Sequence, residues 1–430
     1  MANAAGLVAR NQPYRAEVTR SGRNAIRRLG TLEHLFWLYD QHRSSHFAVT
    51  ALISGQASPR DWRKALDRLQ KRHPILSVCI AAEAGSVPTF RPADVAPIPL
   101  RIVNDEPERR WEAEVAEELA TPFDSSRAPL IRAVLIQRAR DAAFILLAHH
   151  SIADGLSLAY VIRDTLEALA GRPLPPLAWL PSQDDMTSAS EGFADAQEQD
   201  RPRALMPVFH RPRDNARPTV KAARLSPALT ASIRERARQE GTTVHGALCA
   251  ALVLASRDAL DVPREIPLRI FSPLNARAPE AGESCGLFLG ATTSVFDRQT
   301  AGFWDIAREA KAGIAANSTP EHMAARLSLL RRAVASGADV ARAAAIGAEL
   351  FRGEFVLTNL GSLSLNQKFG PFTLKAMFGP AVLTGLQGQQ TIGVSTVNGS
   401  LCLLQTSHTP LDGLLAEVQS VLAQASDDRG

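Results

Sequence analysis

Two adjacent histidines close an apolar run and are the residues of this chain best suited to acid–base chemistry. The run is Phe-Ile-Leu-Leu-Ala at 144–148, and His149 and His150 follow it directly. Such a run before a turn is typical of a buried strand, along which side chains alternate. We therefore expect one ring to reach a cavity while the other goes into the structure. An imidazole with a pKa near ~6.5 could take a proton in that cavity at neutral pH.

Metal and nucleotide chemistry are not expected at this pair. Adjacent residues of a strand cannot easily share one ion, and the chain has no HExxH or CxxC motif to supply further ligands. It also lacks the GxSxG, GxxxxGK[ST] and GxGxxG patterns of serine hydrolases and nucleotide sites. We predict no bound metal or cofactor. Four widely spaced cysteines predict core positions in a reduced, cytoplasmic protein: Cys79, Cys249, Cys285 and Cys402.

An acidic residue and a glycine follow the histidines at the start of an amphipathic pattern. Asp154 comes four residues after His150, and Gly155 precedes a helix predicted over 156–169. The Asp154 carboxylate could cap the helix, orient the turn or meet a buried cation. Gly155 would allow a close approach of another backbone or a positive φ.

The elements that must position this segment alternate along the chain. Asn398-Gly399 is the strongest hairpin signal. The interspersed pattern predicts an α/β or α+β class with large sheets. The predicted strands are Ile75–Ala81, Phe144–Ala148, Pro267–Phe271, Phe355–Leu357, Phe372–Ala376, Ile392–Val397 and Leu401–Gln405. The predicted helices are 31–39, 108–120, 156–169, 243–258, 302–315, 322–335 and 411–424, with a short one near 188–200.

Two segments begin alike, which indicates two similar lobes. Ser58-Pro59 and Ser226-Pro227 each open an amphipathic helical pattern, with serine as the cap and proline at the first helical position. Chance could also produce this repetition, because Ser-Pro is a common helix start. Two lobes nevertheless agree with the length of the chain, since 430 residues suggest two or three core-forming units.

A connector separates the predicted lobes. Residues 171–220 hold eight prolines and an acidic patch and show little periodicity. The predicted organisation is therefore a basic N-terminal extension at 1–25, an N-terminal lobe at 26–170, a Pro-rich linker at 171–220 and a C-terminal lobe at 221–430.

The composition excludes several classes of protein. Hydrophobic residues make up 45% and charged residues 21%, which is ordinary for a folded chain and unlike a disordered, collagenous or coiled-coil protein. No stretch approaches the ~18 apolar residues of a membrane span, and the N-terminal segment lacks an apolar signal core. A net charge of +4 is compatible with an acidic partner but too small to indicate nucleic acid.

The sequence HHSIADG, His149 to Gly155, resembles the HHxxxDG motif of the chloramphenicol-acetyltransferase-like superfamily. This superfamily includes condensation domains of peptide synthetases, polyketide-associated acyltransferases and the plant BAHD enzymes. The DFGWG motif of the plant branch is absent. Further segments resemble the family in order: Arg28-Leu29 with Glu33 and Phe36, His73-Pro74-Ile75-Leu76, Ser272 to Arg277, and Thr358-Asn359-Leu360-Gly361.

The resemblance implies a fold and a set of site residues. It implies two lobes that meet in a V, each a mixed sheet flanked by helices, with a tunnel between them. It makes His150 the catalytic base and His149 mainly structural. It pairs Asp154 with Arg277 in a salt bridge that holds the turn. The candidates for oxyanion stabilisation or a tunnel role are Gly155, through its backbone N–H, Ser151, Ser272 and Asn359.

The activity that the resemblance implies is acyl transfer. A free-standing condensation enzyme would move an acyl group from a phosphopantetheine thioester on an acyl or peptidyl carrier protein to a small-molecule alcohol or amine. An ester or amide would form in secondary metabolism, and the family is usually monomeric. The alternatives are a coenzyme A-dependent O-acyltransferase on a small or lipid alcohol, and a non-catalytic platform that binds carrier proteins. Epimerisation, another use of the fold, is disfavoured.

The basic N-terminal segment has two interpretations. Residues 1–28 contain six arginines against one acid, Glu17. A solvated tail is the simplest interpretation. The alternative is that the segment docks an acidic carrier protein or part of a synthase, because opposite charges favour encounter.

Overall fold

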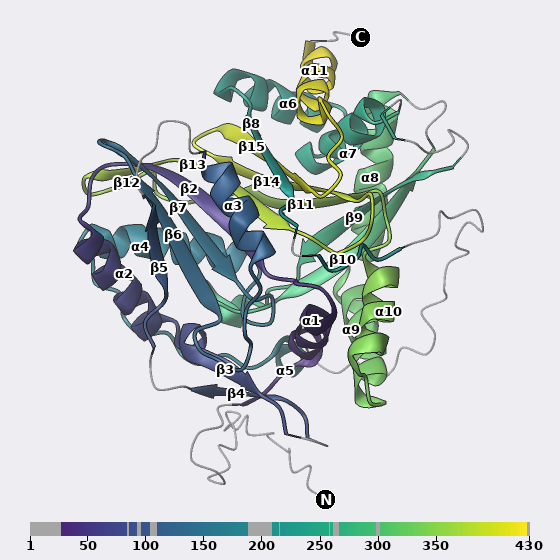
Figure 1. Ribbon diagram of the computed structural model, residues 1–430. Coiled ribbons are helices and arrows are strands. Elements are labelled where there is room, and N and C mark those ends of the chain that lie inside the picture. Colours follow the sequence, from purple (N-terminus) through teal and green to yellow (C-terminus); the bar gives the residue numbers. More distant parts are fainter. Residues whose placement is uncertain are drawn as a thin grey trace, which may run out of the picture.

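The protein is represented by a computed structural model. The basic extension predicted at 1–25 and the helix predicted near 188–200 lie outside the residues that it describes. Across the described ranges, strands and helices are interspersed, as predicted (Figure 1). The structure describes residues 27–83, 86–92, 96–103, 110–187, 209–214, 216–257, 259–260, 266–297 and 302–427.

The first large sheet carries the histidine pair at the end of one strand. Its order within the described residues is β12-β13-β2-β7-β6-β5, and only the β5–β6 pair is parallel. The central strands are buried along nearly their whole length, in keeping with their apolar sequences. The strands are β2 (Phe47–Ser54), β5 (Leu100–Val103), β6 (Ile131–Gln137), β7 (Asp141–Ala148), β12 (Lys368–Phe369) and β13 (Phe372–Val382).

The second large sheet belongs to the other half of the chain. Its order in the described ranges is β10-β9-β11-β14-β15-β8, with parallel pairing of β11 to both β9 and β14. The predicted Asn398-Gly399 turn joins β14 to β15, and both residues have positive φ. The strands are β8 (Thr219–Arg224), β9 (Leu268–Asn275), β10 (Leu289–Phe296), β11 (Phe355–Ser362), β14 (Gln390–Val397) and β15 (Ser400–Ser407).

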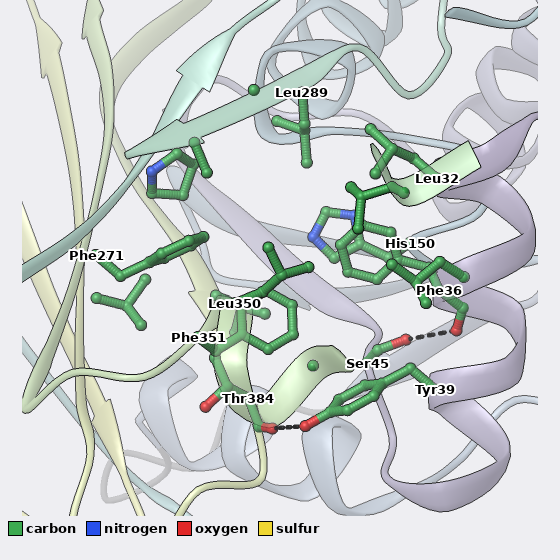
Figure 2. A pocket seen from close by; sticks show the side chains of 18 of the residues that line it. Leu32, Phe36, Tyr39, Ser45, His150, Phe271, Leu289, Leu350, Phe351 and Thr384 are labelled. Carbon is green, nitrogen blue, oxygen red and sulfur yellow. Dashed lines mark hydrogen bonds between the residues drawn. The ribbon is translucent and has the colours of Figure 1, made fainter. Parts of the chain in front are cut away.

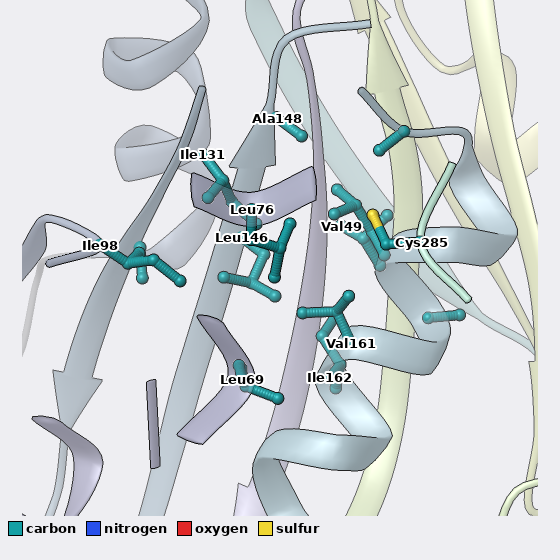
Figure 3. Packing of buried hydrophobic residues seen from close by; sticks show 14 of the residues in the cluster. Val49, Leu69, Leu76, Ile98, Ile131, Leu146, Ala148, Val161, Ile162 and Cys285 are labelled. Atoms are coloured by element: carbon teal, nitrogen blue, oxygen red, sulfur yellow. The ribbon is translucent and has the colours of Figure 1, made fainter. Parts of the chain in front are cut away.

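Helices cover the outer faces of both sheets (Figure 1). α2 (Pro59–Arg72) and α4 (Gly155–Leu169) pack on the first sheet and enclose its main core (Figure 3). The second sheet is covered by α6 (Pro227–Gln239), α7 (Val244–Ala255), α8 (Phe303–Asn317) and α11 (Leu414–Asp427). The fold is therefore mixed α/β with two mixed sheets flanked by helices, as predicted.

The remaining elements lie at the lower end of the molecule in Figure 1 or between the sheets. α1 packs against α9 and α10 through a small apolar cluster. The three-stranded sheet β1-β4-β3 lies below the first sheet. These elements are α1 (Thr31–His42), α3 (Trp111–Ala120), α5 (Gln183–Met186), α9 (Pro320–Ala335), α10 (Val340–Leu350), β1 (Arg27–Arg28), β3 (Val78–Ala81), β4 (Thr89–Pro92) and the 3₁₀ turns at Pro74–Ser77 and Pro279–Ala281.

Both predicted Ser-Pro helix starts are present. The Ser58 hydroxyl accepts the Asp61 amide, and the Ser226 hydroxyl accepts the Leu229 amide, which satisfies a free N–H in the first turn of each helix. The strand predicted at Ile75–Ala81 is shorter than expected and begins at Val78. Pro74 cannot donate to a strand ladder, and residues 74–77 form a 3₁₀ turn instead.

The C-terminal half of the chain contributes two strands to the first sheet. β12 and β13 come from the segment predicted as the C-terminal lobe, 221–430, yet β13 pairs with β2 of the first sheet. Its backbone also lies directly on β14, because a Cβ at Gly393 would come within 2.2 Å of the Pro380 carbonyl oxygen. The boundary predicted at residue 220 therefore does not separate the two sheets. No helix in the described ranges is both long and apolar enough to cross a membrane.

Candidate active site

The HHSIADG segment forms a tight turn between the end of β7 and the start of α4. β7 ends at Ala148, and the His149 amide then donates to the Leu130 carbonyl at 3.0 Å. α4 begins at Gly155, with Asp154 as its cap, whose carboxylate accepts the Ser157 amide at 2.7 Å. The two histidines consequently point to opposite sides of the turn, as strand alternation predicted.

His150 faces an apolar pocket and lies between two phenylalanine rings. The Phe36 ring stacks on the imidazole at a centroid distance of 4.2 Å, and the Phe47 ring lies 4.5 Å away. The His150 Nδ1 atom lies 3.1 Å from the Ala153 carbonyl oxygen. Because a carbonyl only accepts, Nδ1 carries the proton and Nε2 keeps its lone pair. The imidazole is therefore oriented as a base (Figure 2).

The surroundings of His150 favour its neutral form. Burial, with a smaller effect from the neighbouring His149, lowers the pKa of His150 to about 4. The imidazole is thus uncharged at neutral pH and able to accept a proton. Its weak basicity also makes the proton easy to pass on.

His149 is enclosed on the other side of the turn. Its ring is fully buried, Nδ1 accepts the Ser151 amide at 3.1 Å, and Nε2 lies 3.5 Å from Asp40 Oδ2. The Asp40 carboxylate also accepts the Ser45 amide at 2.7 Å. Burial alone would raise the pKa of Asp40, but His149 and Ser45 outweigh it and hold that pKa below its usual value. This environment agrees with the structural role predicted for His149.

Asp154 and Arg277 form the predicted ion pair. Arg277 Nη2 lies 3.2 and 3.3 Å from the two carboxylate oxygens, and the side chains are only 4% and 6% exposed. Asp154 also accepts the amide of Phe288 at 3.1 Å, and Arg277 donates to the Ser157 hydroxyl at 2.7 Å. The pair therefore fastens the histidine turn to the segment that precedes β10.

Gly155 is required for close packing rather than for a special φ. A Cβ on this residue would lie 2.6 Å from Pro380 Cγ and 2.7 Å from Leu360 Cδ2. Its φ is not in the positive range. Of the two roles that the sequence left open, the structure supports the close approach.

Two of the predicted oxyanion candidates point away from the pocket. The buried Ser151 hydroxyl donates to the Glu33 carbonyl at 2.8 Å. The Ser272 hydroxyl lies 3.0 Å from His245 Nε2, because strand alternation directs Phe271 and Pro273 to the pocket and Ser272 to the opposite face. The prediction that either hydroxyl could stabilise an oxyanion is therefore wrong.

Asn359 is engaged in a local turn. Its side-chain oxygen accepts the Gly361 amide at 2.8 Å, and the residue is not among those that line the pocket. The tunnel role expected for Asn359 has no contact to support it in the described part of the chain.

The pocket beside His150 lies where the two halves of the molecule meet. It holds about 1080 Å³ of space, part of it open to solvent. Its walls come from α1, the antiparallel strands β9 and β10, α9, α10, β11 and the end of β13. Figure 2 shows leucine and phenylalanine side chains pointing into this space around the imidazole. The chief apolar members are Leu32, Phe36, Phe271, Leu289, Leu350 and Phe351.

Sequence reasoning missed most of this wall. Phe36 was noted only as part of a motif, and Phe47 and Phe351 carried no signal, since an apolar residue in a helix or strand is usually core. α10 was missed altogether, although its apolar residues gather on one side of the helix, and the residues that it buries are small ones. The spacing of Phe36 and Phe47 around the histidines becomes meaningful only once β2 is placed beside β7.

A second cleft adjoins the pocket. Leu383 and Thr384 line both spaces, and the cleft holds about 670 Å³ of space, part of it open to solvent. Its lining is more polar and includes His408 and residues 385–389. Arg211 also lines it and pairs with Asp214 at 2.6 Å.

Two families of known proteins match the sequence. The condensation domain matches residues 35–255, about half of the chain, and the C-terminus of phthiocerol/phthiodiolone dimycocerosyl transferase matches residues 214–363. A plipastatin synthase of Bacillus subtilis (strain 168) is 30% identical over 217 residues, which are 46% of this chain and 8% of that protein. Tyrocidine synthase 3 of Brevibacillus parabrevis is 27% identical over 255 residues, 55% of this chain and 4% of that protein. The chain thus spans only a small part of these relatives.

Solved structures match over nearly the whole chain. Polyketide synthase associated protein 5 from Mycobacterium tuberculosis aligns with a TM-score of 0.66 and 17% identity, covering 95% of this chain and 100% of that one. The first condensation domain of the calcium-dependent antibiotic synthetase, in complex with a substrate analogue, aligns with a TM-score of 0.71 and 16% identity, covering 94% and 98%. At such identities the likeness shows the fold, which is the one that the motifs predicted.

Proposed function

The chain belongs to the condensation-domain family, whose members are acyltransferases, and we propose that it moves an acyl group from a carrier-bound phosphopantetheine thioester to an alcohol or amine. One observation carries this proposal. The His150 imidazole is neutral, oriented through Nδ1 and exposed through Nε2 to a pocket between the two halves of the molecule.

The proposed reaction uses His150 as a general base. Nε2 takes the proton of the acceptor hydroxyl or amine while that oxygen or nitrogen attacks the thioester carbonyl carbon. A C–O or C–N bond forms, the C–S bond breaks, and the proton passes to the departing sulfur. The products are an ester or amide and a free thiol, so the step needs no oxidant or reductant.

The oxyanion of the tetrahedral intermediate needs a donor near the imidazole. The backbone N–H of Gly155 is the proposed donor. Gly155 is not among the described residues that line the pocket, but it opens α4 within five residues of His150, and the first N–H groups of a helix have no partner within the helix. Its approach to Pro380 and Leu360 would keep this amide in place.

A carrier protein is the preferred source of the acyl group. Coenzyme A would bring additional phosphates, for which a cluster of cationic groups would be expected. Among the described residues that line the second cleft, the charged side chains other than histidine are Arg211 and Asp214, and these two pair with each other. The relatives named as synthases also fit a carrier-bound donor.

The test offers one acyl group on an acyl carrier protein and on coenzyme A, together with a panel of alcohols and amines. Mass spectrometry follows the product. We expect transfer from the carrier protein and a fall of ~10²–10⁴ in kcat for His150→Ala, the usual contribution of a positioned base. His322→Ala, an exposed histidine on α9, is the matched control and should keep full activity.

The other outcomes separate the alternatives. Efficient transfer from coenzyme A alone would favour the O-acyltransferase. Binding of the carrier protein without turnover from any donor would favour a non-catalytic platform. Turnover that survives His150→Ala would overturn the assignment of the base.

A further inference from the structure

The pocket beside His150 has an unusually uniform lining. Leucine, phenylalanine, methionine, valine, alanine and proline make up most of it, and they come from seven helices and strands in both halves of the chain. Such a surface gains free energy by excluding water from an apolar ligand. The chemical class of the ligand therefore depends on the few polar groups in the wall.

Those polar groups are already engaged within the protein. The Tyr39 hydroxyl donates to the Thr384 carbonyl, and the Thr384 hydroxyl contacts Gln389. The Ser45 hydroxyl lies 3.3 Å from the Asp40 carboxylate and 3.4 Å from the Phe36 carbonyl. Arg326 also has an interaction partner inside the protein. An ammonium or amide group of an aminoacyl substrate would therefore lose water without gaining a dedicated partner.

One wall of the pocket is built by close packing of α10 against α1. A Cβ at Gly347 would come within 2.2 Å of the Tyr39 ring, so α10 can approach α1 only with glycine at this position. This approach brings Leu350 and Phe351 to the pocket (Figure 2). β10 closes another side, where Gly290 leaves room for the Met323 side chain of α9.

We propose that this pocket binds an aliphatic chain and that the β10 residue Ala291, which lines the pocket, helps to set the length of chain that it accepts. The inference rests on the proposed acyl transfer and names its substrate class. The chain could belong to the acyl group or to the alcohol. In either case the reacting carbonyl or hydroxyl lies at His150 and the hydrocarbon extends between α10 and β10.

The experiment has two arms that distinguish these sources. In one arm, carrier-bound acyl groups from acetyl to palmitoyl are offered with a short alcohol. In the other, alcohols from ethanol to hexadecanol are offered with an acetyl donor. We expect kcat/KM in one arm to rise by about fourfold for each added methylene, the usual value of a buried CH₂, until the pocket is full. Alanyl and glutaminyl donors should react more slowly than aliphatic acyl groups of similar size.

A substitution that fills the pocket tests the specificity directly. In Ala291→Phe, kcat/KM should stop rising at a shorter chain length than in the wild type. The ratio of kcat/KM for palmitoyl over acetyl donors, or for hexadecanol over ethanol, should fall at least tenfold, the effect of a few lost methylene contacts. Val295→Phe is the matched control, because Val295 lies on the same strand but is exposed and does not line the pocket. It should leave this chain length and this ratio unchanged.

A binding measurement tests the aliphatic pocket independently of acyl transfer. The probe is cis-parinaric acid, a fluorescent long-chain acid, displaced by alcohols of increasing length. One outcome would support the aliphatic pocket and contradict acyl transfer. In that outcome no donor supports turnover, but longer alcohols displace the probe at lower concentrations, and Ala291→Phe weakens the binding of the long alcohols. If turnover occurs without chain-length dependence, or aminoacyl donors outcompete aliphatic ones, the aliphatic pocket is wrong.

Discussion

The two sides of the histidine turn place the same side chain in opposite environments. His149 contacts a carboxylate and a backbone amide in a fully buried polar network. His150 is held between two phenylalanine rings, with a single backbone carbonyl at Nδ1 and the pocket at Nε2. One peptide bond thus suffices to separate a structural imidazole from a base, because strand geometry sends the two rings to different surroundings.

The largest expected effect is on the base. His150→Ala should lower kcat by ~10²–10⁴, whereas the free energy of unfolding should fall by only about 1–3 kcal/mol, the value of the two lost contacts with Phe36 and Phe47. Steady-state kinetics and urea unfolding measure the two quantities. A variant that unfolds readily would show that His150, like His149, serves mainly the structure.

The second largest expected effect is on the stability of the protein, through the ion pair that holds the turn. Arg277→Ala would leave the buried Asp154 carboxylate without its ion pair, which typically costs about 3–5 kcal/mol in free energy of unfolding. Urea unfolding measures it, with Arg331→Ala at an exposed position of α9 as the control. An equal, small change in the free energy of unfolding of both variants would show that Arg277 does not stabilise the turn.

A third test adds a methyl group at the foot of α4. Gly155→Ala should destabilise the protein by about 1–3 kcal/mol, because its Cβ would press on Pro380 and Leu360. Gly313→Ala in α8 is the contrasting change. Its nearest neighbour would lie 3.7 Å away, so the better helix former should stabilise by up to ~1 kcal/mol. Thermal unfolding that ranks the two variants in the reverse order would contradict this packing.

The smallest expected effect is on the pH dependence of activity. Only neutral His150 can act as a base, and burial lowers its pKa to about 4, so activity should persist as the pH falls below ~6.5 and be lost only near the lowered pKa. Phe36→Leu would admit water to the ring and shift the acidic limb of kcat/KM upward by up to about one unit. Phe123→Leu, beside His149, is the control and should not move that limb.

Local sequence signals predicted the turn and missed the pocket. Asp154, Gly155 and the two histidines act within a few residues of one another, so strand alternation and helix capping sufficed to place them. The pairing of Asp154 with Arg277 came from the family resemblance. The aromatic wall depends on contacts between residues more than a hundred positions apart, such as Phe36 with Phe351, which no local pattern encodes.

The error at Ser272 has a simple physical cause. Its neighbour Ile270 is fully buried in the core of the second sheet, and residues two apart in a strand share a face. Ser272 therefore had to face α7, where it meets His245, while Phe271 and Pro273 took the pocket side. The alternation of the two faces of β9 could be read from the sequence. Which face meets the pocket became known only when the partner strands were placed.

The pairing of β13 with β2 has a consequence for attempts to divide this protein. A protease cut or a gene split between residues 187 and 209 would leave β13 on the C-terminal fragment, although its main-chain partner β2 lies on the other. The N-terminal fragment alone would then expose the edge of β2 that pairs with β13, and the unpaired N–H and C=O groups of this edge would favour aggregation with other chains. The two fragments should be obtained together, as a noncovalent pair, or not at all.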